Sequence, residues 1–194
     1  MIRLYSPAKT EEIIQKLEPV IRQVSADYGV PGAAICAILF REIKEIDLMD
    51  AAADAAVRFG WFGRSDSSTG YMQIFGRVAI RALRFAQEHG IETPDRLGMP
   101  DGLDENVPAD VRTMWLRLNR DTAFNLRMGT LNLLAAAHEA AGEADFGRLG
   151  ADGMKRAFSR YNANTCSVTS YGEEVWGYYL KYGGESREGE KHEL

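Results

Sequence analysis

Residues 32–42 read GAAICAILFRE and form the most apolar helical segment around a carboxylate, Glu42. Its apolar side chains fall on every face of a helix, and its first charged residues are Arg41 and Glu42. A helix that is apolar all round is a buried helix. The sequence therefore predicts a mainly α-helical domain around this buried central helix, which ends close to a carboxylate.

Glu42 is a candidate general acid. A carboxylate at the end of a buried helix is costly unless it is paired or protonated, and burial raises its pKa. A raised pKa keeps a carboxyl protonated near neutral pH, as an enzymatic acid requires. The alternative is that the helix surfaces at Arg41 and that Glu42 is its first solvated residue.

Composition indicates one globular domain. The chain has 194 residues, of which 45% are hydrophobic and 26% charged, and a net charge of −5. We expect a single domain over residues 1–184, with the helical segment 1–29 packed on it and a disordered tail at 185–194. The acidic charge argues against nucleic-acid binding. No apolar run approaches the ~20 residues of a transmembrane helix.

Helical patterns extend over most of the chain. We expect helices at about 10–27, 50–59, 72–89, 154–161 and 171–182, and one or two more between 108 and 141. Thr10 is the expected N-cap of the first, which Gly29 ends and Pro19 kinks. The Gly- and Ser-rich stretch predicts a loop or at most a small β-hairpin near residues 60–75.

The cysteines and histidines do not predict a metal site or any cofactor. Cys36 and Cys166 are far apart and lack metal-ligand spacing, and the three histidines are scattered. A disulfide between the two cysteines is one alternative. Two buried thiols are favoured in a chain so poor in cysteine.

Residues 67–74, SSTGYMQI, form a second candidate site. Gly70 allows a close approach of the backbone to a ligand. The Gln73 amide can hydrogen-bond hydroxyl or N-acetyl groups, and Tyr71 offers a flat face for a sugar ring. A loop that leads into a helix needs no ligand, however, so a purely structural role is the alternative.

A third candidate site lies at residues 161–164. Tyr161 ends a helix, where its hydroxyl can reach a neighbouring carboxyl. The alternative is that Phe158 and Tyr161 belong to the core and that Asn162 terminates the helix. The tyrosines of the final helix, from Tyr171 onward, have the helical spacing of an aromatic packing face.

These three segments, in this order, resemble the lysozyme-like superfamily, which includes goose-type lysozymes and soluble lytic transglycosylases. In that family a catalytic Glu ends an apolar helix, a Gly-Leu-Met-Gln-Ile motif follows, and a later helix ends in Tyr-Asn-Ala-Gly. Residues 125–134 look like the long helix between the last two motifs. The resemblance covers residues 30–182.

The chain departs from the family pattern at three positions. Tyr71 stands in place of Leu, Asn164 in place of Gly, and Ile43 in place of a common Ser. Asn tolerates left-handed backbone angles, so Asn164 is expected to keep the turn. Ile43 removes one polar partner of Glu42.

The resemblance implies cleavage of the β-1,4 bond between N-acetylmuramic acid and N-acetylglucosamine in peptidoglycan. Glu42 would protonate the glycosidic oxygen, with Tyr161 near it and a hydroxyl of Ser67 or Ser68 bonded to its carboxyl. The implied substrate-binding residues are Ser68, Tyr71, Met72, Gln73, Tyr161 and Asn162.

The mechanism depends on a second carboxylate. An inverting hydrolase needs a base ~6.5–9.5 Å from the acid, and Asp66, in the loop before Gly70, is the predicted base. Goose-type hydrolases have a second Asp position just after the Gly-x-Met-Gln motif, but Phe75 stands there and cannot act as a base. Asp47 and Asp50 are alternative bases. Without a base the enzyme would be a lytic transglycosylase, which forms anhydro-muramic ends. A third hypothesis is an inactive glycan-binding or structural module.

The predicted partners are peptidoglycan glycan strands, with chitin-type glycans a less favoured substrate. The first residues lack the features of a signal peptide. We therefore expect synthesis in the cytoplasm and action on the bacterial cell wall, in the periplasm or outside the cell, after export by another route. A phage holin, a contractile secretion system and a trimmed start are the alternatives. A toxin delivered into competitors would imply an inhibitor or immunity protein, of which the sequence gives no sign.

Overall fold

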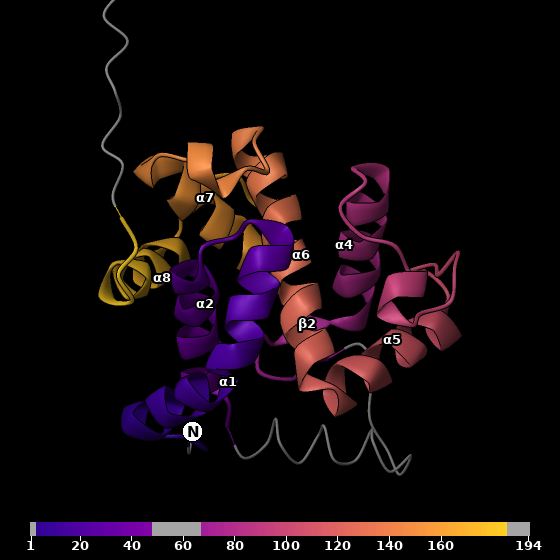
Figure 1. The fold of residues 1–194 in the computed structure, drawn as a ribbon, viewed down its shortest axis with the longest axis horizontal. Coiled ribbons are helices and arrows are strands. Elements are labelled where there is room, and N and C mark those ends of the chain that lie inside the picture. The colour runs from indigo at the N-terminus through magenta and orange to yellow at the C-terminus, as the bar shows by residue number, and fades with distance from the viewer. Residues whose placement is uncertain (1–2, 48–66, 186–194) are drawn as a thin grey trace, which may run out of the picture.

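The computed structural model describes residues 3–47 and 67–185 (Figure 1). Helices make up most of this part of the chain, so the prediction of a mainly α-helical fold is confirmed. The elements are α1 (Pro7–Tyr28), α2 (Gly32–Glu45), β1 (Ser68–Thr69), β2 (Ile74–Phe75), α4 (Gly76–Glu88), η1 (Asp95–Leu97), α5 (Pro108–Arg120), α6 (Thr122–Ala141), η2 (Phe146–Arg148), α7 (Ala151–Asn162) and α8 (Ser170–Lys181). The expected helix at 50–59 and the tail from 186 lie outside the described residues.

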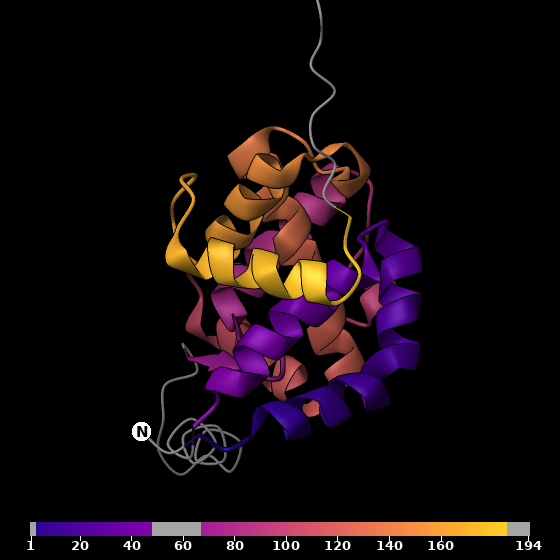
Figure 2. The same cartoon turned by 90° about the vertical axis from the view of Figure 1, so that its left-hand side faces the viewer.

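Helix α1 begins earlier than its pattern predicts. The Ser6 side chain accepts a hydrogen bond from the Lys9 amide, which makes Ser6 the N-cap. Thr10 lies within the helix, where its buried hydroxyl donates to the Ser6 carbonyl at 3.1 Å. The axis of α1 bends along its length, and Pro19 lies inside the helix, as expected for a kink (Figures 1 and 2). Gly29 ends it at φ 67°.

The central helix is α6 rather than α2. Helix α6 packs against α1, α4, α5 and α7 and runs through the middle of the fold (Figure 1). Helix α2 packs between α1 and α8. Its Ile35, Ile38 and Leu39 are fully buried, whereas Cys36 stays partly exposed. The segment 32–42 is therefore a core helix, as predicted, but a second apolar helix occupies the centre.

A two-stranded antiparallel hairpin precedes α4. Ser68 pairs with Phe75 and Thr69 with Ile74, which confirms the small hairpin expected near residues 60–75 within its described part. The helix expected from Met72 begins only at Gly76, because residues 70–73 form the turn of the hairpin.

The two cysteines are free thiols. Cys36 is partly buried and Cys166 is exposed, so the expectation of two buried thiols is wrong for Cys166. Over residues 3–47 and 67–185 no group of three or more metal-ligating side chains is found. In the same ranges, none of the helices has the length and the apolar character needed to cross a membrane.

Candidate active site

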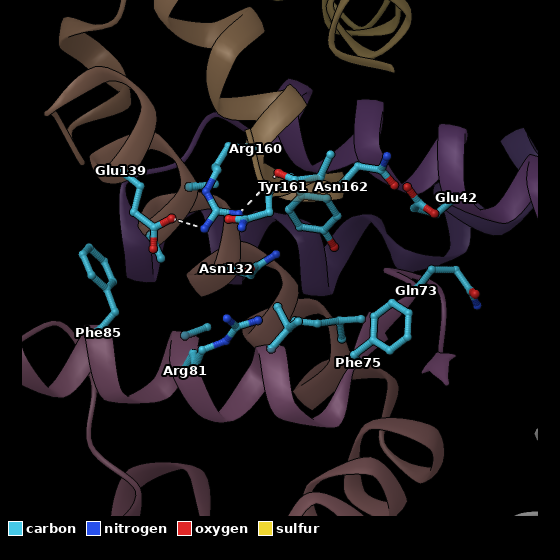
Figure 3. Close-up of a pocket in the computed structure, with 17 residues that line it drawn as sticks. Glu42, Gln73, Phe75, Arg81, Phe85, Asn132, Glu139, Arg160, Tyr161 and Asn162 are labelled. Carbon is cyan, nitrogen blue, oxygen red and sulfur yellow. Dashed lines mark hydrogen bonds and ion pairs between the residues drawn. The ribbon is translucent and has the colours of Figure 1, made fainter. Parts of the chain in front are cut away.

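A cleft of about 400 Å³ lies between α4, α6 and the C-terminal end of α7 (Figure 3). Glu42 and Gln73 lie at one end of it, and Phe85 and Glu139 at the other. The residues that line two of its walls are three or four positions apart, as on one face of a helix. The lining residues of α4 are Val78, Arg81, Ala82 and Phe85, and those of α6 are Asn132, Ala135, Ala136 and Glu139.

Glu42 lies on this cleft with a partly buried side chain. Burial raises the pKa of its carboxyl from 4.5 to about 7, although a hydrogen bond from Tyr171 and the charge of Arg41 act in the opposite direction. A substantial fraction of the carboxyl is thus protonated at neutral pH, the state from which it can donate a proton.

Tyr171 is the hydrogen-bond partner of Glu42. Its buried hydroxyl donates to Oε1 of the carboxylate. The helical spacing assigned Tyr171 to a packing face, and the resemblance implied that Ser67 or Ser68 bonds Glu42. Its place at the start of the last helix offered no local signal, because its partner lies 129 residues away.

Charged residues behind Glu42 join α2 to α8. Glu174 of α8 forms an ion pair with Arg41, whose Nε lies 2.7 Å from the carboxylate, and accepts a hydrogen bond from Lys44 Nζ at 2.8 Å. The Arg41 guanidinium also lies 5.3 Å from the centre of the Tyr171 ring. These contacts fix the start of α8 against the end of α2, which holds the Tyr171 hydroxyl beside Glu42.

Tyr161 lies close to Glu42, as the resemblance implied (Figure 3). Its hydroxyl donates to the Met72 carbonyl at 2.7 Å rather than to the carboxyl. Burial and the nearby charge of Glu42 raise the pKa of this hydroxyl well above 10.0, so Tyr161 stays neutral. It joins the end of α7 to the hairpin turn.

Asn125 anchors the hairpin turn from α6, and sequence reasoning did not assign it to the site. Its fully buried side chain accepts from the Met72 amide at 2.9 Å and donates to the Thr69 carbonyl at 3.1 Å. The available signal was an amide between the apolar residues Phe124 and Leu126, since a buried polar group needs partners.

Gln73 uses most of its amide to hold its own turn. Its Oε1 accepts from Ser68 Oγ at 2.9 Å, and its Nε2 donates to the Gly70 carbonyl at 2.8 Å. These bonds stabilise a backbone at φ 44°, which is unfavourable for a residue with a side chain. A single Nε2 hydrogen remains for a ligand.

Three of the predicted substrate-binding residues, Ser68, Tyr71 and Met72, are not among the residues that line this cleft. The Met72 side chain is fully buried and packs against Gly129. Tyr71 lines a separate hollow of about 240 Å³, which Gln73 also borders. Asn162 is exposed at the edge of the main cleft.

The predicted bases cannot be placed on the cleft. Asp50 and Asp66 lie outside the described residues, and Asp47 is buried away from the cleft, in a β-bridge with Arg3. The carboxylates among the described lining residues are those of Glu42 and Glu139. Glu139 forms an ion pair with Arg160.

The described cleft therefore combines a carboxyl of raised pKa with amide, guanidinium and aromatic groups along an open groove. Such a site can protonate a leaving group on an extended polar substrate. No family model, curated protein or solved structure matches this chain.

Proposed function

We propose that the protein is a peptidoglycan-cleaving glycosidase that cuts the β-1,4 bond between N-acetylmuramic acid and N-acetylglucosamine in the bacterial cell wall. The observation that carries this proposal is the partly buried Glu42 on the cleft, with a carboxyl pKa of about 7. A carboxyl of this kind suits the acid that protonates the glycosidic oxygen while the sugar develops oxocarbenium character.

The surrounding residues have roles that follow from their contacts. Tyr171 orients the Glu42 carboxyl, and Tyr161 keeps the hairpin turn against the end of α7 through the Met72 carbonyl. The free Gln73 N–H is available to an N-acetyl group. The exposed ring of Phe75, on the same cleft, offers an apolar face to a sugar.

Two mechanisms fit this acid. The muramidase mechanism adds water and uses Asp66 as the base. The second candidate, a lytic transglycosylase, is favoured by one observation: within the described lining residues, the carboxylate other than Glu42 is already paired with Arg160. This chemistry needs no protein base, because the N-acetyl group and an internal hydroxyl of the substrate complete the reaction.

Asp66→Asn separates these mechanisms. For the muramidase we expect kcat to fall about 100-fold or more, because the neutral amide cannot activate water, and mass spectrometry of wild-type products to show reducing ends. Asp95→Asn, at the start of η1 and away from the cleft, is the control. Anhydro-muramic ends, together with full activity of Asp66→Asn, would assign the protein to the transglycosylases instead.

Tyr171→Phe is expected to shift the pH profile upward. Glu42 acts only when protonated, so kcat/KM falls as the pH rises through about 7. The Tyr171 hydrogen bond favours the carboxylate and lowers this pKa, and its removal therefore moves the alkaline limb to higher pH. Tyr182→Phe, which removes a hydroxyl bonded to Glu11 just after the end of the same helix, is the matched control. A limb that does not move would contradict the assignment of Glu42 as the titrating acid.

A further inference from the structure

The half of the cleft away from Glu42 is lined by two guanidinium groups and one carboxylate. Arg160 of α7 pairs with Glu139 of α6, and its Nη1 donates to the Ala163 carbonyl at 3.3 Å. Arg81 of α4 is exposed and extends into the cleft (Figure 3). Within the described residues, Arg81 has neither an ion-pair nor a hydrogen-bond partner.

This part of the cleft is positive although the chain is acidic. Two guanidiniums and one carboxylate leave a local charge of one positive unit, whereas the whole chain carries −5. Arg81, which has no partner among the described residues, supplies this excess. A guanidinium fork without a protein partner is suited to a carboxylate, which it binds through two parallel hydrogen bonds.

The same region has space and further hydrogen-bonding capacity for an extended chain. Asn132 of α6 lines the cleft, partly buried, and its amide has no partner in the described part of the protein. The neighbouring wall consists of Ala82, Ala135 and Ala136, whose small side chains leave the groove open. The amide can hydrogen-bond the backbone of a peptide, and the neighbouring guanidinium can pair with a carboxylate of the peptide.

We propose that this half of the cleft binds the peptide stem of peptidoglycan and that Arg81 pairs with a carboxylate of the stem. The inference rests on the proposed function, which places the glycan strand across Glu42. Stem peptides are attached to the strand at the lactyl groups of the muramic acid residues, and they carry free carboxylates. Arg81 is then a specificity residue that favours peptide-bearing strands over bare strands and chitin.

The test compares kcat/KM for soluble strands that carry stems with kcat/KM for the same strands stripped by an amidase. We expect Arg81→Gln to lower the ratio of the two values about tenfold, because it removes a charge-assisted hydrogen bond made only with the stem. Arg112→Gln removes the same charge from an exposed site on α5 and should leave the ratio unchanged. An unchanged ratio in Arg81→Gln would overturn the inference. So would a greater loss on stripped strands, which would place the lactyl carboxylate at Arg81.

A binding measurement separates this inference from the proposed function. In a Glu42→Gln background, calorimetry compares a disaccharide-tetrapeptide with the bare disaccharide, with and without Arg81→Gln. Arg81 is expected to strengthen binding of the peptide-bearing ligand alone. Peptide-dependent binding in a wild type that cleaves nothing would refute the proposed function and keep this inference. Cleavage with binding independent of Arg81 would refute this inference alone.

Discussion

Glu42→Gln is expected to abolish peptidoglycan cleavage, lowering kcat by about 1,000-fold or more. The amide has nearly the shape of the carboxyl but cannot donate a proton to the glycosidic oxygen, and general-acid catalysis contributes about 10²–10⁴-fold. Clearing of a turbid suspension of purified peptidoglycan, followed by quantification of the soluble products, measures the effect. Equal clearing by the wild type and the variant would refute the role of Glu42. Binding without clearing by either protein would support an inactive glycan-binding module.

The same substitution should not unfold the protein. The folded-state pKa of Glu42, about 7, lies above its ordinary value of 4.5. The wild type therefore loses stability as the pH rises from about 4.5 through about 7, whereas the amide does not ionise. Above pH 7 we expect the free energy of unfolding of Glu42→Gln to equal that of the wild type or to exceed it by up to about 3 kcal/mol. Denaturant titration of both proteins measures this difference. A destabilised variant would leave its loss of activity uninformative about catalysis, so this measurement is the control.

Gly70→Ala is expected to destabilise the protein. Gly70 lies at φ +71°, where a side chain is strained, and an added Cβ would come within 2.2 Å of Asn125 Nδ2. Asn125 is fully buried and holds the Thr69 carbonyl and the Met72 amide, so it cannot move without leaving them unbonded. We expect a loss of about 3 kcal/mol in the free energy of unfolding, measured by urea denaturation, together with weaker cleavage because Gln73 is displaced.

Gly98→Ala is the matched control for this prediction. Gly98 lies at φ +64°, similar to Gly70, but an added Cβ would meet nothing within 4 Å. Its substitution should therefore cost only the backbone strain, about 1 kcal/mol. If the two alanine variants are equally stable, the contact between Asn125 and the hairpin turn is not what makes Gly70 necessary.

Local patterns were sufficient to predict most helices and the position of Glu42 at the end of a core helix. Periodic apolar residues indicate which face is buried, and Gly29 ends α1 where a left-handed angle is needed. The start of α4 was predicted too early, because Met72 and Gln73 continue the helical pattern. They form a turn instead, since Asn125, more than 50 residues later, bonds the turn from α6.

The helical class, the apolar helix that ends near Glu42 and the short hairpin after it follow from local sequence patterns. Each of these depends on residues a few positions apart, so local spacing reveals them. Tertiary packing alone sets the hydrogen bond from Tyr171 to Glu42, the hydrogen bond from Tyr161 to the carbonyl of the buried Met72, and the position of Arg81 on the cleft, where it has no partner among the described residues. These features join segments distant along the chain. Their geometry is set by how α2, α4, α6, α7 and α8 pack, which no local pattern specifies.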